Sequence, residues 1–425
     1  METITFDDSG KIFRLGDSLE TDGDTATISA SGITSNSVIT SEEGLNNLRK
    51  NYKSLLTDYP TLRIKMYIKN DLKYIGYATD EEIQFDNLIK IVDAPLMDEV
   101  PERIPLDTPL WRVHLSQIGD KTKIRVSANH CLVDGMGLFD LFDLFTSVAC
   151  GKEIKQSLKD GKNLPILYEF GKKEWYTKEI TENPVENPYN SCPELKDVKI
   201  NPKITVPCSN INPQWSVPYP PISKFCRKYN VTPQGVLMAI QNEANRLFNQ
   251  GKYDEYPIPI YIPVDTRKLP YSTDTLKKSL FFSRVGCIMP LVNKEVDILE
   301  NMKKCTKILK EYVQKTTACD VSYNSANMKD IETGVLTFPD TYPDTYNITF
   351  ASHLGLVGNG FEDIQFRYHG DIDENMYWPC FYGYHTKDTF TFMFSIPSTT
   401  PDSFLQSIKD TSLKYYDFMV NDVKE

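Results

Sequence analysis

A histidine and an aspartate lie four residues apart in the run NHCLVDGMG, which occupies residues 129–137. His130 ends a segment of alternating apolar residues, and Gly135 and Gly137 precede a strongly hydrophobic stretch. Because the unperturbed pKa of histidine lies close to neutrality, an imidazole held at a strand end by a rigid turn suits a general base. The run therefore predicts an enzyme in which His130 removes a proton.

The same residues allow a structural interpretation. Asp134 can cap the hydrophobic helix, and His130 can be an ordinary hydrogen-bonded histidine at a strand edge. Asp134 lies too far along the turn to be assumed a direct partner of His130, and it could pair with an arginine that holds the loop. Acyl transfer from a thioester needs only one histidine base, without a serine or cysteine nucleophile. The residues alone leave both interpretations open.

The elements that must position this run are predicted by apolar spacing. Alternating residues indicate strands at 62–68, 111–115 and 124–128, and the last of these leads to His130. Thr40 and Glu43 suggest a capping box for a helix over 45–56, which Pro60 ends. Residues 138–148 are apolar on most of a helical circumference, so this helix must be buried.

The second half of the chain begins after a proline-rich segment. Nine prolines lie within residues 181–221, which predicts a crossover or linker. Thr232 and Pro233 resemble an N-cap and first helical residue, and the helix should reach about Phe248. Further strands are expected at 258–264, 281–289, 346–352, 364–368 and 389–396, and helices near 294–313 and 402–419. We therefore expect an N-terminal subdomain (1–180), a linker (181–221) and a C-terminal subdomain (222–425).

Composition narrows the class of protein. The 425 residues, 40% of them hydrophobic, can bury a large core and suggest two domains. A net charge of −11 without a basic stripe argues against nucleic acid as a partner. Nine cysteines without paired spacing indicate reduced thiols and neither a disulfide framework nor a metal site. With no apolar run of spanning length, we expect a soluble, cytoplasmic protein without a membrane span.

Together these segments resemble the chloramphenicol acetyltransferase-like superfamily, whose mark is HxxxDG. This superfamily includes nonribosomal peptide condensation domains, plant BAHD acyltransferases and fungal alcohol acetyltransferases. Beside HCLVDG, the resemblance rests on RLG at 14–16 with Glu20, PLWRV at 109–113, the Thr232–Pro233 helix start, PVDTR at 263–267 and SHLG at 352–355. These matches cover nearly the whole chain in the expected order, and the first and last are most similar to alcohol O-acetyltransferases.

The resemblance implies an α/β (α+β) protein in which two similar subdomains form a pseudo-dimer around an active-site channel. His130 matches the general base, Asp134 the structural aspartate and Gly135 the turn glycine. Arg267 matches the arginine expected to form a salt bridge with that aspartate. The resemblance to this branch implies acyl-CoA, in the form of acetyl-CoA, as a co-substrate, with no metal and no tightly bound cofactor, and it implies a monomer.

Other residues have two interpretations each. Ser352 could donate to an oxyanion, or it could end or turn its strand. Aromatic residues at 377–384 could line an acceptor pocket or pack in the core. Lysines could meet coenzyme A phosphates or form a solvated face; they are at positions 152, 155, 159, 162, 172 and 173.

The sequence also departs from its relatives. Asn129 replaces the first histidine of condensation domains, the DFGWG of plant enzymes is missing, and His353 replaces a more usual asparagine. Ser283 and Arg284 stand where a glycine-asparagine pair is often found. The first hypothesis is acyl transfer from acyl-CoA to a small hydrophobic alcohol or amine. The alternatives are a carrier-protein-dependent condensation-type acyltransferase and a non-catalytic binding or scaffold protein.

Overall fold

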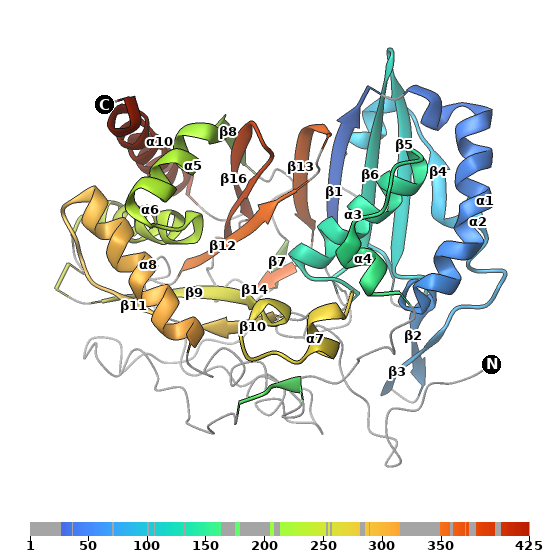
Figure 1. Cartoon of the computed structure of the whole chain (residues 1–425), viewed down its shortest axis with the longest axis horizontal. Coiled ribbons are helices and arrows are strands. Elements are labelled where there is room, and N and C mark those ends of the chain that lie inside the picture. Colours follow the sequence, from blue (N-terminus) through green and yellow to red (C-terminus); the bar gives the residue numbers. More distant parts are fainter. Residues whose placement is uncertain are drawn as a thin grey trace. The chain divides into compact units, whose positions relative to one another are not determined.

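The computed structural model forms two compact units (Figure 1). The first comprises Met1–Phe170, Thr273–Arg284 and Gly358–Gly370, and the second comprises Gly171–Ser272, Val285–Val357 and Asp371–Glu425. The structure describes residues 27–35, 37–69, 72–99, 102–105, 107–130, 132–162, 175–178, 205–207, 213–251, 254–255, 257–280, 285–288, 290–314, 349–357, 360–369, 371–373, 380–395 and 401–424.

The first unit contains a five-stranded sheet among its described residues, in the order β13-β1-β6-β5-β4. The strands are β1 (Thr27–Thr34), β4 (Ile89–Ile91), β5 (Trp111–Ile118), β6 (Lys121–Asn129) and β13 (Glu362–His369). β6 pairs antiparallel with β1 and β5, whereas β4 runs parallel to β5. The predicted strands at 111–115 and 124–128 are confirmed.

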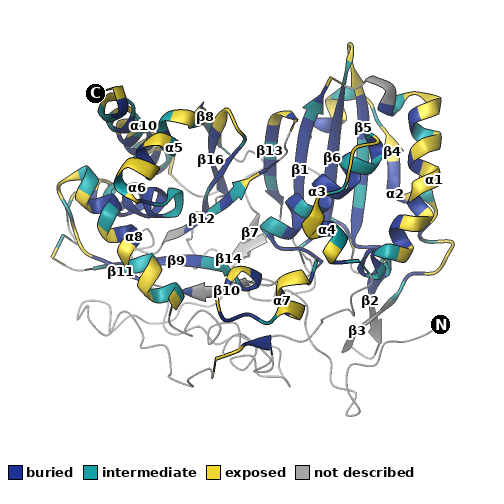
Figure 2. Ribbon diagram, viewed as in Figure 1, coloured by how far each residue is buried: buried dark blue, intermediate teal, exposed yellow. Residues whose placement is uncertain are grey.

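Two helices complete the core of the first unit. α3 (Gly135–Ala149) contacts β1 and β6, and α1 (Glu42–Asp58) packs against α3 (Figure 1). α3 is buried on most of its surface, as predicted, while α1 presents an exposed face (Figure 2). The smaller helices of this unit are α2 (Phe85–Leu88), α4 (Gln156–Asp160) and α7 (Asp274–Lys278).

The start of α1 corrects the predicted capping box. Ser41, with extended backbone, accepts a hydrogen bond from the Gly44 amide at 3.1 Å, whereas Thr40 belongs to a 3₁₀ helix and bonds to Gln117. The predicted strand at 62–68 also begins later, because Leu62 lies in a 3₁₀ helix over Pro60–Arg63. β2 (Ile64–Lys69) follows and pairs with β3 (Leu72–Tyr77).

The second unit is built on a larger sheet, with the order β10-β9-β12-β15-β16-β8 and with β11 also paired to β9. Its strands are β8 (Gln214–Pro218), β9 (Ile258–Asp265), β10 (Val285–Ile288), β11 (Leu291–Val292), β12 (Thr349–Leu356), β15 (Cys380–His385) and β16 (Thr389–Ser395). β12 is parallel to β9 and β15, and the other pairs are antiparallel. A separate pair joins β7 (Thr205–Pro207) to β14 (Asp371–Asp373).

Helix α6 (Pro233–Phe248) is the central helix of the second unit. It contacts β12, β15 and β9 on one side and packs against α8 (Ile298–Gln314) and α10 (Asp402–Lys424) on others. α5 (Tyr219–Tyr229) packs against α10. The Thr232 hydroxyl accepts from the Gly235 amide at 3.0 Å, which confirms the predicted N-cap.

The two units do not follow continuous stretches of sequence. The subdomain boundaries expected above assign residues 222–425 to one subdomain, but β13 pairs with β1 in the sheet of the first unit. The proline-rich segment also contributes β8 to the larger sheet, and α5 begins within it at Tyr219. Strand pairing between segments distant in sequence explains these differences, because local composition does not encode it.

Candidate functional site

His130 directly follows the last residue of β6. Its Nδ1 lies 2.9 Å from the backbone carbonyl oxygen of Val133, three residues along the turn. A carbonyl oxygen can only accept, so Nδ1 carries the hydrogen and donates it. The neutral imidazole therefore has its lone pair on Nε2. The ring is half-buried, and its edge meets Tyr368 of β13 at a centroid distance of 6.1 Å.

Burial determines the protonation of this imidazole. Desolvation lowers the pKa of His130, although the backbone hydrogen bonds and the Asp134 carboxylate act in the opposite direction. The net shift is downward, so the ring is neutral at pH 7. A neutral ring with a fixed tautomer can accept a proton at Nε2.

Asp134 is the N-cap of α3. Its Oδ1 accepts from the Gly137 amide at 2.6 Å, and its backbone carbonyl accepts from the Leu138 amide at 2.8 Å. This is the capping contact of the structural interpretation, and the same contact fixes the turn that carries Val133. Capping and a catalytic histidine are therefore compatible here.

The two glycines of the run have ordinary helical backbones. Gly135 and Gly137 lie in the first turn of α3, and neither has a positive φ. A Cβ at Gly137 would lie 3.3 Å from both Asp134 Oδ1 and Val133 Cβ. Close packing against the turn is thus what Gly137 provides.

Two polar residues that the motif does not include hold the end of β6. Asn129 is fully buried and donates from Nδ2 to the Ile104 carbonyl at 2.8 Å, while its amide donates to the Leu110 carbonyl at 2.8 Å. Thr27, paired with Asn129 in the register of β1 and β6, accepts from the Ile104 amide at 2.9 Å. The segment 104–110 is thereby attached to the strand end. In the sequence, the asparagine next to the histidine was the one indication of this attachment of segment 104–110 to the strand end.

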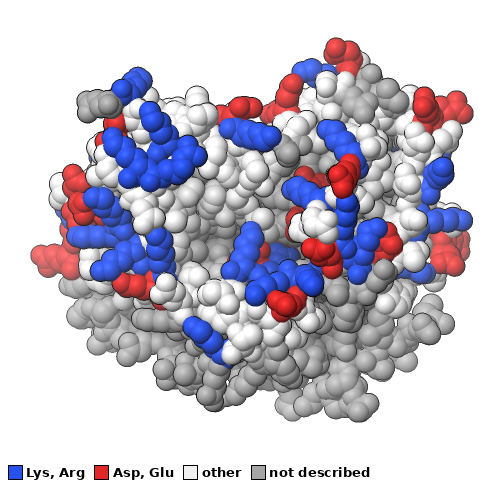
Figure 3. Space-filling model, viewed as in Figure 1, with Lys and Arg blue, Asp and Glu red and all other residues white. Residues whose placement is uncertain are grey.

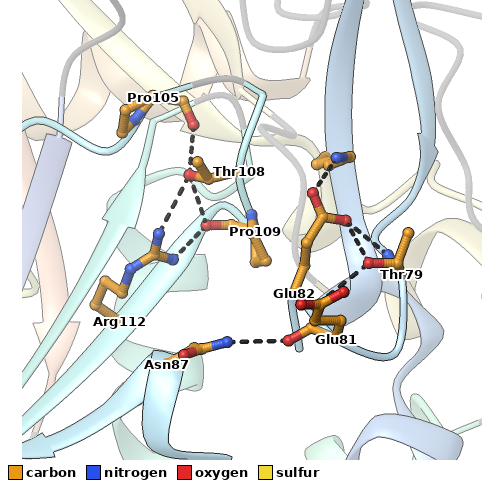
Figure 4. A network of polar contacts seen from close by, with 9 residues as sticks. Thr79, Glu81, Glu82, Asn87, Pro105, Thr108, Pro109 and Arg112 are labelled. Atoms are coloured by element: carbon orange, nitrogen blue, oxygen red, sulfur yellow. Dashed lines mark hydrogen bonds and ion pairs between the residues drawn. The ribbon is translucent and has the colours of Figure 1, made fainter. Parts of the chain in front are cut away.

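Hydrogen bonds of Arg112, in β5, and of Thr108 stabilise segment 104–110 (Figure 4). The Arg112 guanidinium donates to the carbonyls of Pro109 and Trp111 and to the Thr108 hydroxyl, and that hydroxyl donates to the Pro105 carbonyl at 2.9 Å. Burial lowers the pKa of Arg112. Figure 4 also shows Thr79 and Glu82 closing a neighbouring turn through hydrogen bonds between the carboxylate and the threonine amide and hydroxyl.

The remaining predicted site residues belong to the second unit. Arg267 lies in a 3₁₀ helix over Thr266–Lys268, is 7% exposed, and donates from Nε to Asp265 Oδ1 at 2.7 Å. Asp134 belongs to the first unit, so the Asp134–Arg267 salt bridge stays a prediction. Ser352 lies in β12 and is 6% exposed. Within the described part of the chain its hydroxyl makes no hydrogen bond.

Two other histidines lie together in the second unit. The rings of His353 and His385 are 5.2 Å apart, and burial lowers their pKa values to about 3 and about 4. His353 Nε2 and His385 Nδ1 are buried without a hydrogen-bond partner in the described structure. Both rings are thus neutral. Among the described residues, no group of three or more His, Cys, Asp or Glu side chains is arranged to hold a metal ion.

Three of the lysines considered for coenzyme A phosphates form ion pairs within the protein. Lys155 pairs with Asp143, Lys159 with Glu153 and Lys162 with Asp58. Basic and acidic side chains accordingly lie side by side around α4 (Figure 3). The solvated-face interpretation is favoured for these three.

Several predictions cannot be placed. The residues of these predictions that lie outside the described ones are Arg14, Leu15, Gly16, Glu20, Lys172, Lys173, Ser283, Arg284, Tyr377 and Trp378. Of the aromatic cluster, Phe381 and Tyr384 are fully buried in β15, which favours core packing for these two. Within the described ranges, no helix has both the length and the apolar character needed to span a bilayer.

Solved structures resemble this chain over nearly its whole length. The epimerization domain from the third module of tyrocidine synthetase B is 13% identical with a TM-score of 0.62, covering 92% of each chain. The first condensation domain of the calcium-dependent antibiotic synthetase, in complex with a substrate analogue, is 9% identical with a TM-score of 0.62, covering 94% of this chain and 91% of its own. The chain has the fold of these epimerization and condensation domains.

A third structure with this fold holds coenzyme A. TRI101 of F. sporotrichioides, complexed with coenzyme A and T-2, is 12% identical with a TM-score of 0.58, covering 94% of this chain and 96% of its own. No protein-family profile matches the sequence, and no curated protein sequence matches it. At these identities the likeness establishes the fold, and the alcohol O-acetyltransferase branch stays a prediction.

Proposed function

We propose that the protein is an acyltransferase that moves an acyl group from a thioester to the hydroxyl or amine of a small, hydrophobic acceptor. The observation that carries this proposal is the 2.9 Å hydrogen bond from His130 Nδ1 to the Val133 carbonyl. It fixes the tautomer in which Nε2 accepts a proton, and burial keeps the ring neutral. The fold supports the same chemistry at a general level.

The reaction needs no covalent acyl-enzyme. Nε2 of His130 takes the acceptor proton while the acceptor oxygen or nitrogen attacks the thioester carbonyl carbon. The resulting tetrahedral intermediate carries an oxyanion, to which Ser352 is the proposed donor. As the carbon–sulfur bond breaks, the imidazolium returns its proton to the departing thiolate. The Nδ1 bond to Val133 is kept throughout, so the ring does not need to reorient.

Acetyl-CoA is the proposed donor. The TRI101 structure contains coenzyme A, which supports a CoA thioester, and the opening and late motifs of the sequence are similar to those of alcohol O-acetyltransferases. Within the proposal, Asp134 and Gly135 maintain the turn, and Arg267 pairs with Asp134. A carrier-protein thioester remains the nearest alternative donor.

The test is thiol release from acetyl-CoA in the presence of a panel of alcohols and amines. Wild-type protein should release coenzyme A with at least one acceptor, and His130→Ala should abolish most of this release without unfolding. His114→Ala is the matched control, because His114 lies in β5 of the same sheet, opposite Lys90 and Arg125 and away from the end of β6. Equal activity of His130→Ala and wild type would contradict the proposal.

A further inference from the structure

In the larger sheet, the pairing between β9 and β12 ends part-way along β12. Among the described residues, these strands pair only at Thr349 with Ile260 and at Phe350 with Tyr261, whereas β12 continues its pairing with β15 as far as Leu356. Beyond Phe350, backbone groups on the β9 side of β12 need other partners, because unpaired buried peptide groups are costly. β12 also contains a bulge between His353 and Gly355, and Gly355 has a φ of +82°.

A side chain supplies these partners. Gln234, at the start of α6, donates from Nε2 to the Ala351 carbonyl at 2.9 Å. Its Oε1 accepts from the His353 amide at 2.6 Å. One glutamine thus replaces two bonds that a neighbouring strand would make, at the positions immediately before and after Ser352.

The first turn of α6, which carries Gln234, is attached to α8. Pro233 and the Thr232 cap define the first turn of α6, and the Thr232 amide donates to the Thr306 hydroxyl of α8 at 3.2 Å. A Cβ at Gly235 would lie only 2.1 Å from Thr306 Oγ1, so α6 approaches α8 closely at this turn. The glutamine has little freedom to follow a displaced strand.

Ser352 lies between the two anchored positions. The residue is 6% exposed, and within the described structure its hydroxyl has no hydrogen-bond partner. A hydroxyl without a protein partner, on a backbone that is fixed on both sides, is pre-organised to donate to a group that is brought to it.

We propose that Gln234 is a positioning residue, which holds the Ser352 hydroxyl in place to donate to the oxyanion formed during acyl transfer. This inference rests on the proposed function and assigns it a residue outside the recognised motifs. Gln234 does not touch the reacting atoms and acts only through the backbone of β12.

The first test compares Gln234→Leu with Gln241→Leu. Gln241 lies seven residues later on α6 and is fully buried, and its side chain makes no hydrogen bond in the described structure, so it is the matched control. With acetyl-CoA and the most active acceptor of the panel, Gln234→Leu should lower kcat about 10-fold and change KM less than about twofold, because an oxyanion donor acts in the transition state. Gln241→Leu should leave both unchanged. A raised KM at constant kcat would overturn the inference.

The second test asks whether the effect passes through Ser352. In a Ser352→Ala background, Gln234→Leu should cause no further loss, because the group that it positions is gone. The same 10-fold loss in both backgrounds would overturn the inference and indicate a general structural role.

Gln234→Glu provides a variant closer in shape. It keeps the acceptor for the His353 amide, but an ionised carboxylate faces the Ala351 carbonyl instead of a donor. Its kcat should recover toward the wild-type value as the pH falls and the carboxyl becomes protonated. A pH profile identical to that of wild type would overturn the inference. If His130→Ala is inactive while Gln234→Leu equals wild type, only the positioning role fails; activity of His130→Ala contradicts the proposed function itself.

Discussion

The end of β6 and the middle of β12 satisfy their backbone groups in different ways. At each, a strand delivers a histidine and an amide side chain satisfies backbone groups: Asn129 bonds to Ile104, and Gln234 bonds to Ala351 and His353. After β6, the chain turns so that a carbonyl meets the imidazole of His130. In β12, the backbone is held and the imidazole of His353 is left with a buried, unpartnered Nε2 within the described structure.

This difference separates a histidine prepared for proton transfer from one prepared for packing. His130 has one nitrogen fixed as donor and is half-buried, whereas His353 stacks on Phe390 with its ring planes 4° apart. A fixed tautomer, and not burial alone, is what makes an imidazole a usable base.

The largest expected difference between His130 and His353 is in turnover. His130→Ala should lower kcat by at least about 10²-fold, since general-base catalysis by a side chain contributes about that much or more. His353→Ala should keep kcat within about 10-fold and act mainly on stability. Thiol release from acetyl-CoA and thermal unfolding of both variants check this. A larger loss of kcat in His353→Ala than in His130→Ala would contradict this difference.

The next effect concerns the amide at the end of β6. Asn129→Ala removes a buried donor to the Ile104 carbonyl and should lower the free energy of unfolding by about 1–3 kcal/mol. The control is Asn51→Ala, because Asn51 donates to the Asn47 carbonyl from an exposed position and should cost less than about 0.5 kcal/mol. Urea unfolding measures both. Equal losses would show that the end of β6 does not depend on Asn129.

Acid should lower the free energy of unfolding through the histidine pair of the second unit, His353 and His385. The folded-state pKa values of His353 and His385, about 3 and about 4, lie below the usual value of 6.5. Below pH 6.5 the unfolded chain therefore binds more protons, and stability falls as the pH drops toward 4. Each histidine contributes a slope of at most about 1.4 kcal/mol per pH unit.

Urea unfolding between pH 7 and pH 4 tests this slope. His385→Gln should reduce it, although His114, whose pKa is also lowered to about 4, contributes with the same sign in the first unit. An unchanged slope in His385→Gln would show that His385 is not the source.

The smallest effect distinguishes capping from ion pairing at Asp134. Asp134→Ala removes the N-cap of α3 and should cost about 1 kcal/mol, whereas Asp134→Asn keeps an acceptor for the Gly137 amide. If Asp134 only caps, Asp134→Asn should be nearly as stable as wild type. A double-mutant cycle of Asp134→Asn with Arg267→Gln measures the predicted salt bridge, and a coupling energy near zero would contradict it.

The sequence predicted local elements where local patterns sufficed. The alternation over 124–128 and the apolar circumference of 138–148 led to β6 and α3, and the Thr232–Pro233 pair led to α6. The prediction of the α1 cap was wrong by one residue, because neighbouring Thr40 and Ser41 both have suitable hydroxyls and only the backbone angles distinguish them. The sequence did not predict β8, because the strand lies in a proline-rich segment; an edge strand tolerates proline at its end.

Residue type and apolar spacing were sufficient to predict that a histidine would end a half-buried strand before a buried helix, because both act over a few neighbours. The folded structure was needed to show that β13 belongs to the first sheet, that Val133 fixes the tautomer of His130, and that Gln234 replaces strand bonds beside Ser352. These are hydrogen bonds whose partners are set by the path of the chain, and side-chain spacing does not specify that path.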